Sequence, residues 1–278
     1  MTRAETMIAG EPVTRDAFLG GAVEVLQPAS GHHRAGLEAV LLAAALPRDF
    51  AGLIVDLGAG AGVAGMCAAA ARAHCASMLV ERDPVLAACA RTALMLPVNR
   101  AFASRVVVAE VDIAAPEAVR RAAGVPDNAA DVVLMNPPFY VGDRVSAPRP
   151  PARAAAHVLA DEGLRLWFRA GANCLKHGGI LIAVGRAADL SAILAAAAER
   201  FGSIDVLPIR ARPRAEAHRV LIRARAAAEG ETAMLPALSL HAEAGPFLPE
   251  IDRLLRGAAT LGKIHAPWRA AGRAHVDR

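Results

Sequence analysis

The sequence predicts an α/β protein built on a doubly wound, mostly parallel sheet. Short apolar runs indicate buried strands, and most are followed by a segment typical of a helix. A glycine-rich segment comes directly after the first run, as at the ligand-binding edge of such sheets. The last two runs have no clear helix between them, so we expect them to form a closing antiparallel hairpin at one edge. The strands are expected at 53–57, 78–81, 105–109, 131–135, 179–184, 203–209 and 218–225.

The helices between these strands have local signals. An apolar helix over 37–46 is stopped by Pro47, since proline cannot continue the hydrogen-bond ladder. An Ala-rich helix follows the glycines over 63–74, Pro84 opens the next helix at its first position, and a further helix spans 161–175.

We divide the chain into three parts. Residues 1–48 form an N-terminal segment that packs on the core, 49–258 hold the sheet, and 259–278 form a basic, mobile tail. Segment 141–156 contains three prolines and several arginines without strong periodicity, which predicts a flexible loop directly after the fourth of the expected strands.

The composition favours a cytoplasmic protein. The 278 residues are 55% hydrophobic but only 4% aromatic, so the core must be built from Ala, Val and Leu. No uninterrupted apolar run reaches the ~18 residues that a membrane span needs, and no signal peptide is evident. The four cysteines form no C-x-x-C pair and indicate buried thiols in a reducing compartment. The net charge of +4 weakly favours a polyanionic partner.

The glycine-rich segment can be interpreted in two ways. Gly60-x-Gly62-x-x-Gly65 matches the dinucleotide fingerprint, and Glu81 lies about 20 residues further on, as the acid for a ribose does. The same loop, with an acid ending the second strand, also holds S-adenosylmethionine. Asp56, just before the glycines, fits this methyl-donor pattern better, because the acid then sits near the cationic amino-acid end of the cofactor.

A third acid follows the third expected strand. Asp112 is placed to meet the adenine amino group of the cofactor, although the cap of a helix N-terminus explains it equally well by itself. Three acids and a glycine loop at successive strand ends together indicate a ligand-binding site, because ligands bind at the carboxyl ends of strands in open α/β sheets.

The run Asn136-Pro137-Pro138-Phe139 ends the fourth expected strand. The prolines stiffen the turn and leave carbonyls unpaired, and the residue before a proline is extended. The Asn136 side-chain carbonyl and the Pro137 carbonyl then converge as two acceptors, which suits the two donors of an exocyclic –NH2. Phe139 offers a face on which a planar ring stacks. The alternative is an ordinary Asn-Pro strand exit with Phe139 in the core.

Together these motifs resemble the class I methyltransferases that modify exocyclic amines, and more closely the bacterial tRNA(Val) adenine-N6 methyltransferases. The flanks add to the resemblance. They are Gln27-Pro28 to Gly31, Arg34, Leu37-Glu38-x-x-Leu41-Leu42-Ala43, Arg212-Pro213-Arg214, Val220-Leu221-Ile222 and Phe247-Leu248-Pro249-Glu250-Ile251. The chain departs from the family at Gly36, Glu38 and Ala39, and has His32 or His33 near an expected aromatic residue.

The resemblance implies a seven-stranded Rossmann-like methyltransferase fold with a C-terminal antiparallel hairpin, over a methyltransferase domain at 49–258. It implies S-adenosylmethionine as cofactor and RNA, with tRNA favoured, as the substrate. We expect a monomer, no membrane and no metal, since His32 and His33 have no ligand partners at suitable spacing.

The resemblance also assigns residues to roles. The catalytic residues implied are Asn136, Pro137 and Phe139. The cofactor-binding residues implied are Asp56, Gly58, Ala59, Gly60, Gly62, Glu81, Arg82, Asp112, Ile113 and Asn136. The substrate-binding residues expected are Pro138, Phe139, Tyr140, Arg144, Arg149, Arg153 and Arg34, and a second basic patch is expected from Arg210, Arg212, Arg214 and Arg219.

Other functions stay open. Protein-glutamine methyltransferases share Asn-Pro-Pro but usually carry Tyr at the fourth position, and guanine-N2 rRNA methyltransferases share Asn-Pro-Pro-Phe in longer chains. A NAD-dependent oxidoreductase using the Gly60 fingerprint leaves Asn136 and Asp112 unexplained. A degenerate binding module is a further possibility, although the full set of motifs is intact.

Overall fold

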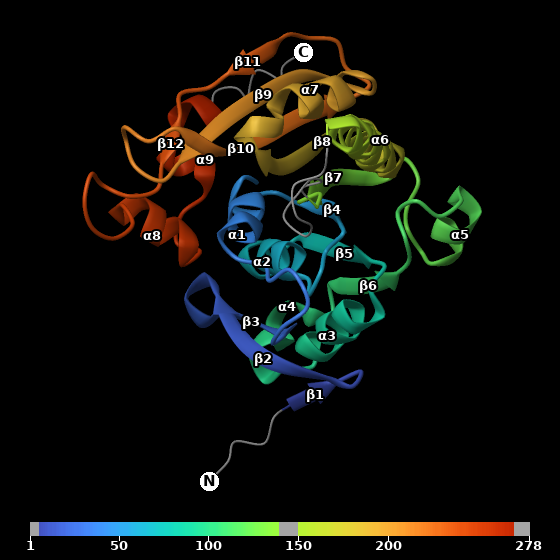
Figure 1. The fold of residues 1–278 in the computed structure, drawn as a ribbon. Helices are drawn as coiled ribbons and strands as arrows, with labels where there is room; N and C mark the ends of the chain where they lie inside the picture. The colour runs from blue at the N-terminus through green and yellow to red at the C-terminus, as the bar shows by residue number, and fades with distance from the viewer. Residues whose placement is uncertain (1–5, 139–149, 270–278) are drawn as a thin grey trace.

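The structure, a computed structural model, describes residues 6–138 and 150–269, with the side chains of 150–161 left out of the description. A large twisted sheet is covered by helices on both faces (Figure 1). Its strand order is β11-β9-β10-β8-β7-β4-β5-β6, and β12 pairs with β9 beside this path. The strands are β4 (Gly52–Leu57), β5 (Cys75–Glu81), β6 (Val106–Glu110), β7 (Ala130–Met135), β8 (Leu175–Arg186), β9 (Phe201–Arg210), β10 (Ala217–Ala226), β11 (Thr232–Met234) and β12 (Leu238–Ser239).

The doubly wound sheet predicted from the sequence is confirmed. Strands β6, β5, β4, β7 and β8 are parallel to one another, whereas β10 lies antiparallel between β8 and β9. The C-terminal hairpin is therefore confirmed as well. It is not the outermost part of the sheet, because β11 and β12 add to the far side of β9 in parallel.

The strands are apolar on both faces because helices cover both. In β7, Val132 and Leu134 join the apolar cluster that contains residues of α1 and α2. Val133 and Met135 point the opposite way, into the cluster with α6 and α7. The helices are α1 (Leu37–Ala44), α2 (Val63–Ala71), α3 (Pro84–Leu94), α4 (Arg100–Ala103), α5 (Glu117–Ala122), α6 (Pro150–Cys174), α7 (Leu190–Ala198), α8 (Pro249–Leu255) and α9 (Leu261–Ile264), with short 3-10 turns η1 (Leu19–Gly21), η2 (Pro97–Asn99) and η3 (Ala187–Asp189).

The N-terminal segment contains a small sheet that the sequence did not predict. Strands β1 (Thr6–Ile8), β2 (Glu11–Phe18) and β3 (Val23–Pro28) pair antiparallel, and β3 packs against α3 (Figure 1). Asn99 fixes this contact. Its Oδ1 accepts from Glu24 N–H at 3.1 Å, and its Nδ2 donates to the carbonyls of Glu24 and Ala93 at 2.7 Å.

Two expected mobile parts are partly ordered. Helix α6 starts at Pro150, so residues 150–156 of the predicted loop are helical. Residues 259–269 of the predicted tail pack on the core, where Trp268 is buried. Trp268 Nε1 donates to the Ala45 carbonyl at 3.0 Å, and the Arg223 guanidinium lies 4.2 Å from the centre of the indole ring. The mobile-tail prediction is therefore wrong for 259–269, and residues 270–278 lie outside the described residues.

Candidate active site

Four strand ends meet at one edge of the sheet. Leu57 at the end of β4 is level with Val80 of β5 and with Met135 of β7. Glu81 at the end of β5 is level with Glu110 of β6. The residues that follow these positions therefore share the carboxyl edge of the sheet, which is where ligands bind in this architecture. The glycine loop, Glu81, Asp112 and Asn136 are all brought to this edge, as the sequence predicts.

The backbone of the glycine loop has positive φ angles, which residues with a side chain adopt only with strain. Gly58 has φ +64°, and a Cβ there would lie 2.2 Å from Trp167 Cη2. Gly60 has φ +58°, but a Cβ there would meet nothing within 4 Å. The loop is thus in contact with Trp167 at Gly58, whereas the space next to Gly60 is open. Ala59 lies between them, and its N–H donates to the Val80 carbonyl at 3.0 Å, which ties the loop to β5.

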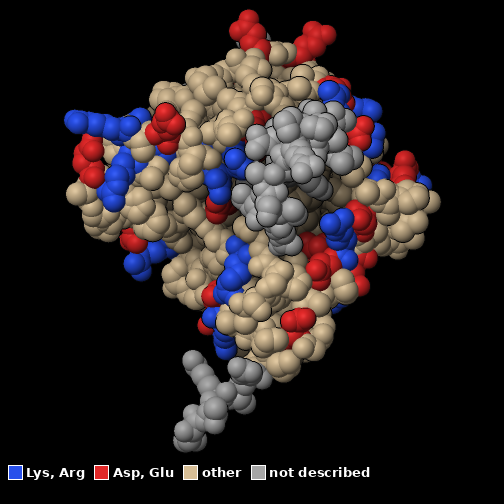
Figure 2. Space-filling model, in the orientation of Figure 1, with Lys and Arg blue, Asp and Glu red and all other residues tan. Residues whose placement is uncertain are grey.

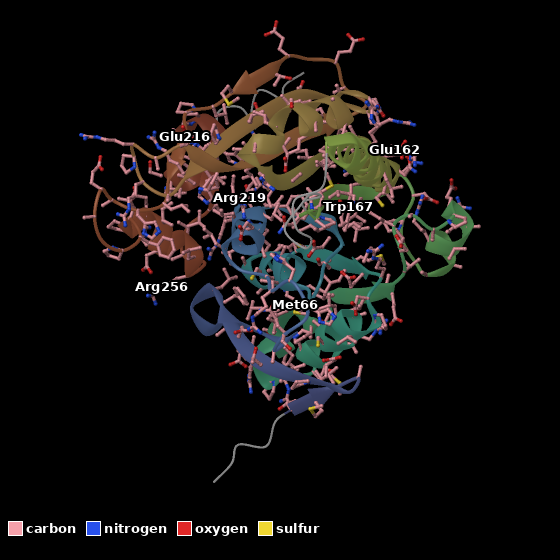
Figure 3. All side chains as sticks on the ribbon, viewed as in Figure 1. Met66, Glu162, Trp167, Glu216, Arg219 and Arg256 are labelled. Atoms are coloured by element: carbon pink, nitrogen blue, oxygen red, sulfur yellow. The ribbon has the colours of Figure 1, made fainter. Side chains whose placement is uncertain are left out.

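Trp167 is a site residue that the sequence analysis did not select. It projects from α6 toward the ends of β4 and β7 (Figure 3), where its ring edge supports Gly58. It is half-buried, whereas its neighbour Phe168 is fully buried. No spacing in the sequence links Trp167 to Gly58, because they are brought together only when α6 packs on the sheet.

Glu81 is held in place by the loops around it. Gly60 N–H donates to Glu81 Oε2 at 2.8 Å, and Asp83 N–H donates to Oε1 at 2.8 Å. The carboxylate is 8% exposed. Each oxygen keeps a further lone pair, since a carboxylate accepts at about four positions. Glu81 is therefore fixed in position and keeps capacity to accept further hydrogen bonds.

Asp56 lies behind the glycine loop and is buried. Its Oδ2 accepts from Gly65 N–H at 2.8 Å, in the first turn of α2, where the unpaired N–H groups of a helix favour a carboxylate. Burial nevertheless raises the pKa of Asp56 to about 7; the Gly65 hydrogen bond lowers this pKa, and the negative charge of Glu81 raises it further. The protonation of Asp56 therefore changes near neutral pH.

Asp112 and Arg82 lie at the more exposed side of this edge. Arg82 Nη1 is 3.2 Å from Asp112 Oδ2, and both side chains are well exposed. Asp112 Oδ1 accepts from Ala114 N–H at 2.8 Å, which closes a local turn. Helix α5 begins only at Glu117, so Asp112 is not its cap. Ile113 beside it is buried.

Asn136 directly follows β7 and carries the least satisfied polar atom of this edge. Its Oδ1 is buried and has no hydrogen-bond partner within residues 6–138 and 150–269. Pro137 is buried and Pro138 is exposed. Phe139, Tyr140, Arg144 and Arg149 lie outside the described residues. Arg153 lies in α6, but its side chain is not described.

The N-terminal segment reaches this edge near Glu81. His32 Nε2 lies 3.2 Å from Asp83 Oδ2, next to Glu81, a contact that the sequence analysis did not predict. Arg34 binds within the small sheet: it donates to the Pro28 carbonyl at 2.9 Å, to Thr14 Oγ1 at 2.8 Å and to Asp16 Oδ2 at 2.6 Å. The substrate-binding role of Arg34 stays a prediction.

The expected second basic patch is largely paired. Arg214 binds Glu243 at 3.2 Å, and Arg219 binds Glu38 at 3.2 Å, between β10 and α1 (Figure 3). Arg210 donates to Ser239 Oγ, and Arg212 donates to two main-chain carbonyls. On the face shown in Figure 2, basic and acidic side chains are interspersed rather than gathered into one basic area.

No cluster of three or more His, Cys, Asp or Glu residues suited to a metal ion occurs among the described residues. Within the same part of the chain, no helix is both long and apolar enough to cross a membrane.

Comparison with known proteins identifies the family. Residues 32–208 match the model of the methyltransferase small domain. The chain belongs to this methyltransferase family. S-Adenosylmethionine is the methyl donor of such enzymes and is the cofactor of this one. The NAD-dependent alternative is thereby set aside.

The structural neighbours agree with the family. A predicted O-methyltransferase from Agrobacterium tumefaciens is 32% identical, with a TM-score of 0.69 over 80% of this chain and 97% of that protein. The 16S rRNA N2 G1207 methyltransferase of T. thermophilus, solved with AdoMet and guanosine, shares the fold at 18% identity and a TM-score of 0.50, over 77% of this methyltransferase and 50% of that chain. A comparison with curated proteins found no match.

Proposed function

We propose that this methyltransferase transfers a methyl group to the N6 amino group of an adenine in RNA, with tRNA as the substrate. The observation that carries the proposal is the buried, unpaired Asn136 Oδ1 at the end of β7. A buried carbonyl oxygen without a partner is costly, so its partner is expected in the ligand. An exocyclic amine supplies such a donor and is the group to be methylated.

The cofactor would occupy the edge between the glycine loop and Asn136. The space in front of Gly60 is open, and Glu81 lies beside it with free acceptor capacity for the ribose hydroxyls. Asp112 follows β6, where it can accept from an adenine amino group. When bound, S-adenosylmethionine supplies a methyl group attached to a sulfonium sulfur. The carbon of this methyl group is electrophilic without further activation.

The residues of the chain then need to align and desolvate the acceptor nitrogen rather than act as a strong base. Asn136 Oδ1 and the Pro137 carbonyl accept hydrogen bonds from the amine and turn its lone pair out of the ring plane. The nitrogen would gain the methyl carbon as the bond from that carbon to sulfur breaks, with S-adenosylhomocysteine as the leaving group, and would then release one proton to solvent. In this proposal Phe139 stacks on the base, Tyr140 covers its edge, and Pro138 lines the entrance. Arg144, Arg149 and Arg153 contact phosphates, so RNA affinity falls steeply with salt.

The test is to incubate the protein with S-adenosylmethionine carrying a labelled methyl group and bulk unmodified tRNA, and to identify the labelled nucleoside. N6-Methyladenosine is expected. Labelled N2-methylguanosine, a ribose or base O-methyl product, or label in protein glutamine would each refute the adenine assignment. A thermal shift with S-adenosylhomocysteine but not NAD would check the cofactor independently of the acceptor.

A further inference from the structure

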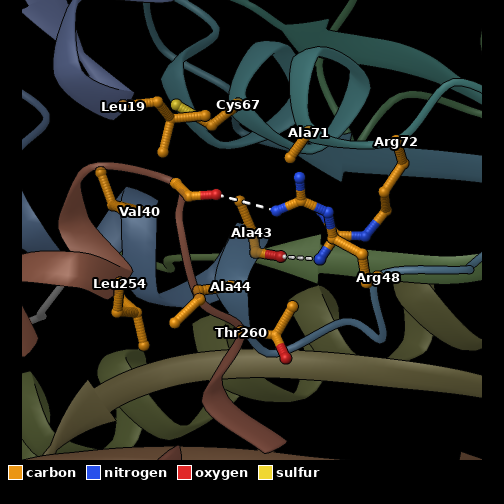
Figure 4. A pocket seen from close by; sticks show the side chains of 12 residues that line it. Leu19, Val40, Ala43, Ala44, Arg48, Cys67, Ala71, Arg72, Leu254 and Thr260 are labelled. Atoms are coloured by element: carbon orange, nitrogen blue, oxygen red, sulfur yellow. Dashed lines mark hydrogen bonds between the residues drawn. The ribbon is translucent and has the colours of Figure 1, made fainter. Parts of the chain in front are cut away.

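A small pocket lies at the other end of the sheet from the glycine loop, between the C-terminal ends of α1 and α2 and the helix α8 (Figure 4). It has room for about one water molecule, so it is too small for a cofactor or a substrate. Arg72 in its wall donates to the Ala43 carbonyl at 2.9 Å, which joins the end of α2 to α1. The space beside Gly60 is different, because a Cβ there would meet nothing within 4 Å.

Trp167 lies behind the loop that borders this open space. It is half-buried and packs at the margin of the apolar cluster that contains Phe168 and Leu57. Phe168, the next residue of α6, is fully buried and meets Phe201 edge-on with ring centroids 6.0 Å apart. The two neighbouring aromatic side chains therefore differ in what they contact. Phe168 packs in the core, whereas Trp167 reaches the carboxyl edge of the sheet (Figure 3).

Gly171 sets how closely α6 approaches the sheet. A Cβ there would lie 2.8 Å from Leu181 Cδ1 and 3.9 Å from Leu57 Cδ1, so the helix backbone lies close to the strands at this point. Trp167 is four residues earlier and therefore lies on the same face of the helix, one turn nearer its N-terminus. Because Gly171 is seated beside Leu57, Trp167 is placed against the next residue of that strand end, Gly58.

The outer ring of Trp167 occupies the place that a side chain at Gly58 would take. A Cβ on Gly58 would collide with Cη2 and would lie 2.9 and 3.3 Å from Cζ3 and Cζ2. All three atoms belong to the six-membered ring at the far end of the indole, which neither leucine nor phenylalanine at position 167 can reach. The loop therefore cannot move toward α6 without displacing the indole.

Hydrogen bonds hold the loop from the direction of β5. Ala59 N–H donates to the Val80 carbonyl at 3.0 Å, and Gly60 N–H donates to Glu81 Oε2 at 2.8 Å. A movement of the loop toward α6 would lengthen or bend both bonds and weaken them. The indole and these two bonds thus fix the loop from different directions, and the second bond also fixes the carboxylate of Glu81.

We propose that Trp167 is a positioning residue for S-adenosylmethionine, because it holds the glycine loop where Glu81 is aligned with the ribose of the cofactor. The inference rests on the cofactor occupying the space in front of Gly60, as in the proposed function, and it does not depend on the methyl acceptor. Without the indole, the loop can move into the space behind Gly58. Glu81 then loses a bond that orients it, and cofactor affinity falls although Trp167 itself need not touch the cofactor.

The experiment compares Trp167→Leu with Phe168→Leu in the full-length protein, by calorimetric titration with S-adenosylhomocysteine and by thermal unfolding. Both variants replace an aromatic side chain of α6 by leucine. Trp167→Leu should raise Kd about tenfold, which corresponds to one poorly aligned hydrogen bond to a charged group. Phe168→Leu should change Kd by less than about twofold, while its Tm falls at least as far, because Phe168 is the more buried residue.

Trp167→Phe is the milder variant. It keeps an aromatic ring against the core and removes only the outer ring that contacts Gly58. Its Kd should therefore rise with little change in Tm. An unchanged Kd in this folded variant would contradict the positioning role, even if Trp167→Leu is too unstable to titrate.

A change at the partner position tests the contact directly. In the wild type, Gly58→Ala places a methyl group against the indole, so Tm should fall by about 6 °C from the collision and the backbone strain together. In the Trp167→Leu background the collision is absent, so the same change should lower Tm by only about 2 °C, from strain alone. Equal falls in the two backgrounds would show that the assigned contact is wrong.

Gly60→Ala separates this inference from the proposed function. Its methyl group enters the space assigned to the cofactor, so Kd should rise. If Gly60→Ala raises Kd and Trp167→Leu does not, the positioning role is wrong and the cofactor site stands. If neither variant changes Kd, the cofactor does not use the glycine loop and both proposals fail. If Phe168→Leu raises Kd as much as Trp167→Leu, the effect comes from general packing of α6, which also refutes the positioning role.

Discussion

At the ends of β4 and β5, the carboxylates of Asp56 and Glu81 already bind backbone N–H groups of the loops around them. At the end of β7, Asn136 Oδ1 is buried but has no such partner within the described residues. The half of the edge proposed to bind the cofactor is thus part of the folded hydrogen-bond network, whereas the half proposed to bind the methyl acceptor contains an unpaired acceptor atom. Changes in the first half should affect folding and cofactor affinity together, and changes in the second should affect turnover alone.

Asn136→Ala should produce the largest effect. Under the proposed function Asn136 accepts a hydrogen bond from the reacting nitrogen, so its loss should lower kcat by about 10²–10³-fold. Cofactor affinity should change by less than about twofold, and the free energy of unfolding should not fall, because an unpaired buried oxygen is removed. Single-turnover kinetics, cofactor titration and urea unfolding measure the three quantities.

Asn99→Ala is the matched control for this variant. Asn99 is a fully buried asparagine whose side chain is hydrogen-bonded to Glu24 and Ala93, whereas Asn136 is partly exposed and only its Oδ1 is buried. Its removal should cost about 2–3 kcal/mol of stability and leave kcat per folded molecule unchanged. If both variants lose stability and turnover alike, the contrast between the two halves is incorrect.

The pH dependence of stability should reveal Asp56. Its raised pKa means that the folded protein binds more protons than the unfolded chain between about pH 4 and 7. The contribution of protonated Asp56 to the free energy of unfolding is fully present below the pKa of Asp56 in the unfolded chain. It is lost as the pH rises through about 7. Asp56→Asn should remove this part of the pH dependence, which amounts to a change in the free energy of unfolding on the order of a few kcal/mol. Urea unfolding at pH 5 and pH 8 compares the two proteins; identical slopes would show that another group is responsible.

Gly58→Ala and Gly60→Ala form a pair that separates packing from backbone strain. Both residues have positive φ, which costs alanine about 1 kcal/mol. At Gly58 the added methyl also collides with Trp167, so the loss of stability should rise to about 2–3 kcal/mol. At Gly60 the methyl enters the open space, so cofactor affinity should fall more than stability. Thermal unfolding and S-adenosylhomocysteine titration distinguish them; equal stability losses would contradict the packing at Gly58.

Arg82→Ala should have the smallest effect. Its contact with Asp112 is exposed, and such pairs contribute about 0–1 kcal/mol. Stability should therefore change by less than about 1 kcal/mol, and cofactor affinity by a few-fold at most. A loss of stability comparable to that of Gly58→Ala would place Arg82 in the folded network of the cofactor half. The measurement is the same thermal and ligand titration.

The sequence predicted the carboxyl edge well because its features are local. Glycines, acids and Asn136 each follow an apolar strand directly, and parallel strands bring their ends together. Trp167 could not be assigned, since its contact with Gly58 depends on how α6 packs. The small N-terminal sheet was missed because β2 reads as mixed rather than alternating, with partly exposed residues throughout. The start of α6 at Pro150 had a signal, proline at the first turn, that was interpreted as a loop.

The C-terminal segment was mispredicted for a different reason. Trp268 is a single aromatic residue in an Arg- and Ala-rich stretch, so composition indicated a mobile end. Its burial depends on Arg223, Asp205 and the Ala45 carbonyl, which are far away in the chain. Long-range polar partners of this kind leave no periodic trace in the sequence.

The position of Trp268 has a consequence for biosynthesis. It is among the largest fully buried side chains and joins the cluster that contains α1 and α2, yet it is more than two hundred residues from Ala45 along the chain. A growing polypeptide on the ribosome cannot complete that cluster until residue 268 has left the exit tunnel. The packing of this cluster therefore waits for the C-terminal segment, and until then the Arg223–Asp205 pair lacks the indole that covers it in the folded protein.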